Sequence, residues 1–388
     1  NVKILIDKKE AVLLPLTINV YPFKLVKMDK NLYIYTYKYK TDTLDNLLKD
    51  WIDQRCHGMT MSTLPIPMER SGDIKREELV PVLETYKKAN FEQPYFHLEL
   101  DNRITCEWLN APDKSTKPPM WGAWFRYYPF SDFLDKRYVE TVKFINEEAK
   151  KLGLKPMLAV ADEAGSHAWT IEATKHYNAL IKRELPEVIR ELTVGGGWAS
   201  NEPEHQHWKG LLDIWTTNRW LADKIDMVKN SDKNAKFQLY NMGGSGSEAG
   251  SNQAARNLYG FFAWKTKVIG ASQWVYYNSD TPANCYAWPA EDEKDGKVGT
   301  LKWEAVREGA KDLKYVLTLE KLINEKKGKP ADIEAAKKYL SDLSYKIELK
   351  ADSYDIESGG RIKSQREGTY EQWRDKIAEF IVKLTVNF

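Results

Sequence analysis

The sequence has few cysteines, three in 388 residues, at Cys56, Cys106 and Cys285. They show no paired metal-ligand spacing, and an odd number is a poor disulfide framework, so we expect no zinc module and no metal. Net charge is also small, because 58 basic residues nearly balance 56 acidic ones. This balance argues against a nucleic-acid-binding surface and against a polybasic membrane surface.

Long apolar runs are absent as well, so we expect no membrane span. The first residues, Asn1–Ile6, lack the layout of a signal peptide, and the chain does not begin with Met. We therefore expect a processed chain or a piece of a longer one. Its beginning does not reveal the compartment, although a secreted or cell-surface location is favoured over a cytoplasmic one.

Aromatic residues are abundant, with 14 Trp and 21 Tyr. Large flat side chains with a polar tip stack on partly apolar ring faces, which sugars possess. For any single Trp or Tyr, packing in a large core is the commoner role. The composition therefore suggests a carbohydrate partner without naming its residues.

Residues 1–28 alternate apolar and polar side chains in two runs, Val2–Ile6 and Val12–Tyr21, and Pro22 should stop the pairing. Two strands do not fold alone, so we interpret them as the end of an N-terminal β-structure.

From Asn31 onward, short strand candidates alternate with amphipathic helices, an order typical of a (β/α)8 barrel. The predicted strands are Leu32–Tyr39, Gly58–Ile66, Tyr95–Asp101, Lys155–Ala161, Val188–Val194, Leu212–Thr216, Lys236–Asn241 and Ile269–Tyr277. The predicted helices are Leu44–Gln54, Arg76–Ala89, Asp135–Leu152, Trp169–Arg183, a weak one near Glu202–Lys209, Arg219–Val228 and Ser251–Lys267.

A polar loop, 278–299, should follow the eighth strand, and a long helix, Leu301–Lys326, should end at Gly328 and Pro330. Two more helices are predicted at Ala331–Leu343 and Tyr370–Leu384. We thus expect three parts: the β-structure at 1–28, the barrel domain at 29–327 and a C-terminal helical extension at 328–388.

In such a barrel, functional groups lie at the carboxyl ends of the strands. Two adjacent acids, Asp162 and Glu163, end the apolar fourth strand, where a buried strand has no use for them. An ordinary strand end or helix N-cap is the competing interpretation. Other candidates at or near strand ends are His57, Glu99, Asp101, Trp215, Tyr240, Asn241, Trp274 and Tyr276, with Trp124 in the long third connection, 102–131.

Paired carboxylates among Trp, Tyr, Asn and His are typical of a glycosidase. In a retaining enzyme with two catalytic carboxylates, the acids stand about 5 Å apart across the scissile bond and usually come from different strands. Neighbouring acids fit substrate assistance better, with attack by the sugar's own 2-acetamido oxygen. Asp162 would orient the acetamido N–H, and Glu163, its pKa raised by apolar surroundings, would donate the proton.

The Asp162-Glu163 pair resembles that of glycoside hydrolase family 123, the N-acetyl-β-galactosaminidases and their relatives. Two further stretches are similar to the same family: 261–274, with its final Trp, and the closing helix 301–315, with its Arg307-Glu308-Gly309-x-x-Asp312 pattern. Ala164 departs from the Pro that often follows the acidic pair. The segment Leu16–Phe23 also resembles the end of the β-sandwich that precedes the family's barrel. The resemblance implies a barrel hydrolase preceded by a remnant of a β-sandwich, in which Asp162 orients the acetamido group and Glu163 is the general acid/base, with no cofactor.

Geometry alone adds Tyr240 as a hydroxyl for the acetamido carbonyl and Trp274 as the floor of the sugar pocket, although each suits the core equally well. His57 could form a hydrogen bond with a sugar hydroxyl. The alternative is a structural histidine whose hydrogen bonds are made within the protein. His205 and His207 superficially suggest a metal, but their spacing fits no standard helical pair, so exposed loop residues are the better interpretation.

The leading hypothesis is therefore a retaining exo-β-N-acetylhexosaminidase acting on an N-acetylhexosamine-containing glycan, with galactosamine favoured. One alternative is a glycosidase for sugars without the acetamido group, with Glu163 as acid and Glu99 or Asp101 as second carboxylate. The other is a non-catalytic carbohydrate-binding or structural barrel module.

Overall fold

The computed structural model describes residues 2–6, 9–14, 18, 20–36, 43–67, 74–98, 130–161, 164, 168–194, 205–217, 230, 232–234, 236–240, 252–278, 285–289, 297–347 and 369–386. Contacts divide the chain into two compact units. One contains residues 27–313 and 344–367, and the other contains residues 1–26, 314–343 and 368–388.

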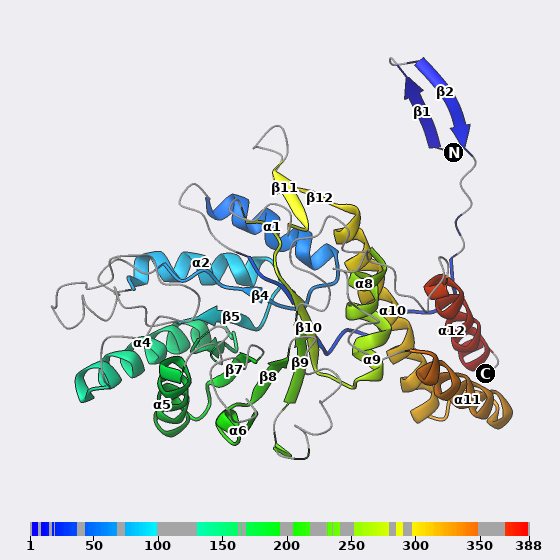
Figure 1. The fold of residues 1–388 in the computed structure, drawn as a ribbon. Coiled ribbons are helices and arrows are strands. Elements are labelled where there is room, and N and C mark those ends of the chain that lie inside the picture. The colour runs from blue at the N-terminus through cyan, green and yellow to red at the C-terminus, as the bar shows by residue number, and fades with distance from the viewer. Residues whose placement is uncertain are drawn as a thin grey trace. The chain divides into compact units, whose positions relative to one another are not determined.

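The larger unit is built on eight parallel strands that curve into a nearly closed barrel with flanking helices (Figure 1), which confirms the predicted (β/α)8 fold. The sheet order is β3-β10-β9-β8-β7-β6-β5-β4, so each strand from β4 to β9 pairs with its successor in the chain, while the first strand, β3, pairs with the last, β10. The strands are β3 (Asn31–Ile34), β4 (Ser62–Thr63), β5 (Pro94–His97), β6 (Met157–Ala159), β7 (Ile189–Val194), β8 (Ile214–Thr217), β9 (Lys236–Tyr240) and β10 (Gly270–Gln273).

Helices follow the strands where apolar residues recur at three- and four-residue steps. Side chains define two of the starts: Thr43 accepts a hydrogen bond from Asn46 N at the start of α1, and Ser131 accepts one from Leu134 N at the start of α4. The helices of the barrel layer are α1 (Leu44–Cys56), α2 (Arg76–Lys88), α4 (Asp132–Lys151), α5 (Ala168–Glu184), α6 (His205–Trp208), α8 (Asn252–Asn257), α9 (Ala263–Lys265) and α10 (Leu301–Asn324). The predicted helix 219–228 lies outside the described residues.

The helix predicted as one piece over 251–267 is interrupted. A π-helical turn, Leu258–Phe262, separates α8 from α9, and Gly260 at its centre has non-helical backbone angles, φ −111° and ψ −112°. Glycine tolerates this conformation, and a π-bulge is a common cause of a local helix break. The apolar pattern continues through the break, which is why periodicity alone predicts an unbroken helix.

The polar loop predicted at 278–299 contains a short antiparallel hairpin, β11 (Ala287–Pro289) and β12 (Lys297–Gly299), in which Trp288 pairs with Val298. Lys297 is nearly buried there, forms an ion pair with Asp50 of α1 and lies over the Tyr277 ring. In its described residues, the loop is therefore held by the pairing of β11 with β12 and by an ion pair with the first barrel helix.

The smaller unit contains two more helices, α11 (Pro330–Lys346) and α12 (Thr369–Val386). Pro330 begins α11, where its missing N–H costs nothing, and Gly328 turns the chain with φ +94°. The hairpin β1 (Val2–Ile6) and β2 (Lys9–Leu14) is antiparallel. The second predicted run, 12–21, is wrong at both bounds, because β2 begins earlier, at Lys9, and the described residues Ile18, Val20 and Tyr21 are not in a strand.

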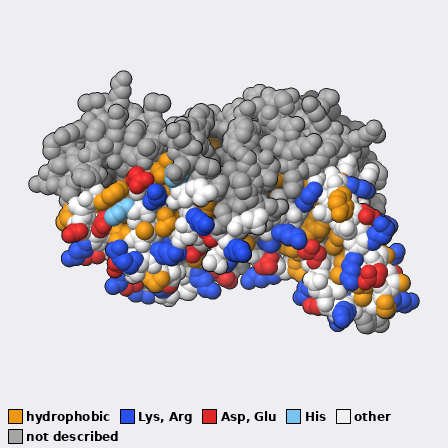
Figure 2. Space-filling view, turned by 60° about the horizontal axis from the view of Figure 1, so that its bottom comes forward, with side chains coloured by type: hydrophobic (Ala, Val, Ile, Leu, Met, Phe, Trp, Pro, Cys, Tyr) orange, Lys and Arg blue, Asp and Glu red, His pale blue; other side chains and the backbone are white. Residues whose placement is uncertain are grey.

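Surface charge is mixed. Figure 2 shows Lys and Arg side chains interspersed with Asp and Glu over the coloured part of the face in view, as expected from a chain with 58 basic and 56 acidic residues. Among the helices in the described part of the chain, none combines the length and apolarity that a membrane crossing requires.

Candidate functional site

The barrel interior is lined by tyrosines. Side chains alternate along a strand, and Tyr33 and Tyr95 share the inward-facing cluster with Met157 and Ala159 of β6, the strand next to β5. The rings of Tyr33 and Tyr95 are 5.3 Å apart and meet edge to face. Interiors of eight-stranded barrels are just wide enough for side chains to fill, so this layer is packed core.

A carboxylate is buried within that core. Glu191 on β7 is fully buried and accepts a hydrogen bond from the Tyr95 hydroxyl. Burial raises the pKa of Tyr95 well above its usual value, and the charge of Glu191 raises it further. On the other side of the barrel, Gln238 donates to the hydroxyls of Tyr33 at 3.1 Å and Thr216 at 2.6 Å. These polar groups therefore pair with each other across the barrel interior.

Above this layer, three rings meet at the carboxyl ends of β3, β9 and β10. Tyr35 lies 5.5 Å from Tyr240, with the ring planes at 70°, and 6.0 Å from Trp274, with the planes at 44°. Trp274 is the partly exposed member of the three, while Tyr240 is buried. The structure thus brings together two predicted sugar-binding residues, Tyr240 and Trp274, and adds Tyr35 to them.

The acidic pair, Asp162 and Glu163, lies outside the described residues. Its described neighbours in sequence, Ala161 and Ala164, are fully buried at the carboxyl end of β6. In the sheet order, β6 is four strands from β10, which places the two strands on opposite walls of the barrel. The roles given to the two acids therefore stay predictions, attached to the strand end opposite Trp274.

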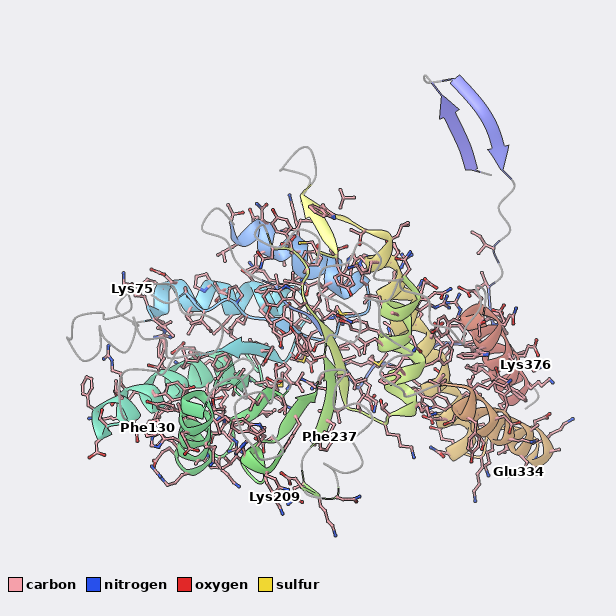
Figure 3. The ribbon with its side chains drawn as sticks, viewed as in Figure 1. Lys75, Phe130, Lys209, Phe237, Glu334 and Lys376 are labelled. Carbon is pink, nitrogen blue, oxygen red and sulfur yellow. The ribbon has the colours of Figure 1, made fainter. Side chains whose placement is uncertain are left out.

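Two predicted sugar-binding residues are core residues in the structure. Trp215 is fully buried, and its ring centroid is 6.0 Å from that of Phe237 on the neighbouring strand (Figure 3). The next residue, Thr216, points into the barrel, so Trp215 lies on the other face of β8. Tyr276 is buried against Trp303, and its hydroxyl donates to Asp53 at 2.9 Å. Because both side chains face the helix layer, the proposed sugar site does not include them.

His57 lies in the turn between α1 and β4, before its strand rather than after it. Its ring stacks on Trp303 with centroids 4.5 Å apart, and its two nitrogens face Asp53 and Glu304. A turn that precedes a barrel strand lies on the face opposite the βα loops. The contacts therefore give His57 a structural role, and the proposed sugar site does not include it.

Three further candidates, Glu99, Asn241 and Trp124, lie outside the described residues, as does the alternative second carboxylate, Asp101. Within the described ranges, no group of three or more His, Cys, Asp and Glu residues is arranged to hold a metal ion. His207 contacts the ring of Trp208 instead, at 5.9 Å between centroids.

Sequence reasoning missed Tyr35 and Glu191. The signal for Tyr35 is present, because Tyr33, Tyr35, Tyr37 and Tyr39 alternate and so share one strand face. Glu191 lies in the middle of strand β7, and a buried acid at such a position needs a partner, which is the Tyr95 hydroxyl. That partner lies 96 positions away in the chain, where no local pattern reveals it.

Comparison with known proteins gives the fold and no closer relationship. No protein-family model matches the chain, and no curated protein matches its sequence. The likeness to glycoside hydrolase family 123 therefore stays a resemblance carried by the motifs quoted above.

Solved structures share the barrel at low identity. The chain is similar to a β-galactosidase from Bacillus circulans sp. alkalophilus, with a TM-score of 0.52 and 12% identity over 75% of this chain and 57% of that one. It is also similar to an endo-1,4-β-D-mannanase from Thermotoga petrophila RKU-1, with a TM-score of 0.47 and 15% identity over 73% and 99%. At such identities the likeness shows the (β/α)8 fold alone.

Proposed function

We propose that this protein is a glycoside hydrolase, a retaining exo-β-N-acetylhexosaminidase that acts through the 2-acetamido group of its substrate. The observation that carries the proposal is the meeting of Tyr35, Tyr240 and Trp274 at the carboxyl ends of three strands, opposite the strand that leads into Asp162-Glu163. Aromatic rings at a barrel mouth suit the apolar face of a pyranose. The β-galactosidase that shares the fold is a glycosidase by name, so this class is the first to test.

The alternation of side chains along β6 supports the role of Glu163. Met157 and Ala159 face the barrel interior, and counting on by twos from them reaches position 163. Asp162 is an odd number of positions away, so in a regular strand its side chain would point to the other face. The two acids therefore contact the same sugar only if the chain leaves the strand and turns into its loop at this point. Adjacent acids then divide the work, with one on the glycosidic oxygen and the other on the acetamido group.

In the first step, the acetamido oxygen attacks the anomeric carbon, and the bond to the leaving oxygen breaks as Glu163 gives that oxygen its proton. Asp162 accepts a hydrogen bond from the acetamido N–H and so stabilises the positive charge that develops in the bicyclic intermediate. In the second step, Glu163 takes a proton from water as the water oxygen attacks the anomeric carbon. The bond between that carbon and the acetamido oxygen breaks, so the second ring of the bicyclic intermediate opens and the acetamido group is restored. Two displacements at one carbon retain its configuration.

Trp274 supplies the stacking surface in this proposal, and Tyr240, whose ring contacts the same Tyr35 ring, supplies the hydroxyl that binds the acetamido carbonyl. The substrate is a glycan that ends in an N-acetylhexosamine, with galactosamine favoured by the resemblance. The mechanism uses no metal and no cofactor.

The test is hydrolysis of aryl N-acetyl-β-hexosaminides. We expect Glu163→Gln to lower kcat/KM by about 10²–10⁴-fold, because a general acid/base contributes that much. Asp162→Asn should slow the first step by a similar factor while sugar binding survives. Glu147→Gln is the matched control, since Glu147 is an exposed acid of α4 whose partner is Lys143.

Near-normal turnover in either variant would show that the roles are assigned wrongly. A thiazoline inhibitor mimics the bicyclic intermediate, so failure to inhibit points to a glycosidase for sugars without the acetamido group, with Glu163 as acid and Glu99 or Asp101 as second carboxylate. Binding of free sugars by calorimetry without release of any aglycone points to a non-catalytic module.

A further inference from the structure

Tyr35 spans the barrel. It follows directly after β3, and its hydroxyl lies 3.5 Å from the Thr193 hydroxyl on β7. Strands β3 and β7 are four places apart in the sheet order, so they form opposite walls. A tyrosine side chain that joins opposite walls occupies the width of an eight-stranded barrel interior.

The backbone of Tyr35 is fixed by the same sheet. Its N–H donates to the Gln273 carbonyl at 3.1 Å, and its own carbonyl accepts from Tyr276 N at 2.8 Å. Pairing with β10 therefore continues beyond the last residue assigned to β3. The Tyr35 side chain is therefore fixed at its backbone by hydrogen bonds to one wall and at its hydroxyl by Thr193 on the other.

Beneath Tyr35, the interior is filled. The Tyr33 ring lies 5.6 Å from it and the Tyr95 ring 5.9 Å, and both of these side chains are fully buried. Their hydroxyls are bonded to buried polar side chains, that of Tyr95 to Glu191 and that of Tyr33 to Gln238. A ligand that enters from the carboxyl ends of the strands therefore meets Tyr35 before any deeper group.

On the other side, Tyr35 contacts the two rings already assigned to the mouth, and the three planes are inclined to each other at 70° and 44°. At these angles neither the Tyr240 ring nor the Trp274 ring stacks flat on the Tyr35 ring. Tyr35 itself is 3% exposed, and Trp274 is more open, so Tyr35 is the deeper of the two.

We propose that Tyr35 is the base of the sugar pocket and sets its depth, so that a bound pyranose ring rests on the Tyr35 ring while it stacks on Trp274. This inference rests on the proposed glycosidase function and adds a ligand-contacting residue to it. The pocket then ends one residue beyond β3, and the sugar lies between Trp274 and the wall from which Asp162 and Glu163 follow. The ring of Tyr35 is what binds, because its hydroxyl faces Thr193.

A purely structural Tyr35 predicts different behaviour. Its removal would then lower stability and leave sugar affinity alone. Tyr86 provides the matched control: it is a fully buried tyrosine of α2, packed 5.0 Å from Trp51 and 5.1 Å from Phe91. Its hydroxyl donates to the Gln93 carbonyl just before β5, at the opposite end of the barrel.

The experiment measures calorimetric binding of N-acetylgalactosamine, N-acetylglucosamine, galactose, glucose, mannose and xylose to the wild type and to Tyr35→Phe, Tyr35→Leu and Tyr86→Leu. We expect Tyr35→Leu to weaken binding of the preferred sugar about tenfold, which corresponds to one lost aromatic contact. Tyr35→Phe keeps the ring and should stay within about threefold of wild type. Tyr86→Leu should lower the Tm and leave affinity unchanged.

A second measurement does not depend on the folding of Tyr35→Leu. With 3-fluorotyrosine placed at position 35 of the intact chain, the fluorine resonance should shift when the preferred sugar is added, and the same label at position 86 should not respond. If the wild type binds sugar while Tyr35→Leu matches it, or while the label at 35 is silent, Tyr35 is not the base and the proposed function stands. If the wild type neither binds any of the six sugars nor releases an aglycone, the proposed function falls and this inference falls with it.

Discussion

His57 has an acceptor on each ring nitrogen. Nδ1 faces the Asp53 carbonyl oxygen at 2.9 Å and its carboxylate at 3.2 Å, and Nε2 faces Glu304 at 3.3 Å. Satisfying both sides requires two N–H groups, which the imidazolium has and the neutral ring lacks. The charged ring therefore links the last turn of α1 to the first turns of α10.

This contact predicts pH-dependent stability. Burial opposes the charged ring, but hydrogen bonds to Asp53 and Glu304 outweigh it, so the pKa of His57 is raised above 6.5 in the folded protein. A raised pKa means that the native state holds the proton more tightly, so this stabilisation is full below pH 6.5 and is lost as pH rises through the folded value. The free energy of unfolding should therefore decrease from about pH 6 to 8.

Urea unfolding at a series of pH values measures the effect, and His57→Gln should flatten that part of the curve. Glu308→Gln is the control, because Glu308 lies on the same helix but pairs with Lys311. A histidine titration by NMR that places the His57 midpoint at or below 6.5 would contradict the explanation.

Residue roles were the hardest feature to predict from sequence. Trp215, Tyr276 and His57 lie close to strand ends, as a sugar site requires, yet their side chains face helices or the opposite end of the barrel. Alternation along a strand predicts which residues share a face, but it does not say which face turns inward until the barrel closes. Tyr240 and Trp274 do meet, because the inward parity of their strands brings them both to Tyr35.

At the scale of elements, the Arg-Glu-Gly-x-x-Asp motif of α10 has residues on the helix surface and a residue in the core, with different contacts. Arg307 and Glu308 form ion pairs along the helix surface, with Glu304 and Lys311. Asp312 is fully buried and binds Arg256 of α8 through two hydrogen bonds, of 2.6 and 3.1 Å. The pattern that the sequence offers as a family likeness thus includes the contact that fastens the closing helix to α8.

Gly309 is the residue that permits this contact. A Cβ at position 309 would lie 2.2 Å from the Arg256 carbonyl oxygen, and a Cβ at Gly260 would lie 3.1 Å from the Gly309 carbonyl oxygen. Two glycines therefore allow the π-helical turn and α10 to approach backbone to backbone. Sequence reasoning singles out Gly309 but not Gly260, and the packing of one against the other is a long-range contact that no local pattern shows.

Gly309→Ala tests the packing, because the sign of its effect on the free energy of unfolding depends on whether the close approach exists. Helix propensity alone would stabilise the protein by up to about 1 kcal/mol, because alanine is the better helix former. The clash with Arg256 should instead destabilise it by about 1–3 kcal/mol, the usual cost of overpacking. Chemical denaturation followed by circular dichroism measures the difference, and a more stable variant would refute the close approach.

At the scale of the whole molecule, the barrel closes between its first two strands through threonines. The Leu32 carbonyl accepts from Thr60 N at 2.8 Å, and Leu32 N donates to the Thr60 hydroxyl at 2.8 Å. Further along, Thr36 N donates to the Thr63 hydroxyl at 2.6 Å, and that hydroxyl donates to the Thr36 carbonyl at 2.8 Å. Side chains thus replace part of the backbone ladder where β3 meets the two-residue strand β4.

The strand order was predictable, because eight short runs separated by helices leave few alternatives to a barrel. The closure was not, because Thr60 and Thr63 read as ordinary strand residues in the sequence. Their hydroxyls matter only because β4 is too short to pair along its whole neighbour. A defect at this join should therefore affect the stability of the entire barrel and not just one loop.

Thr63→Val tests that expectation with a side chain of nearly the same shape. It leaves the Thr36 N–H and carbonyl without the hydroxyl that pairs with both in a buried position, which should cost about 1–3 kcal/mol of unfolding free energy. Thr85→Val is the matched control, because the Thr85 hydroxyl bonds only within its own helix, to the Pro81 carbonyl. Urea unfolding gives the two costs, and hydrogen exchange of the Thr36 amide should accelerate in Thr63→Val alone; equal costs and unchanged exchange would mean that the backbone by itself closes the barrel.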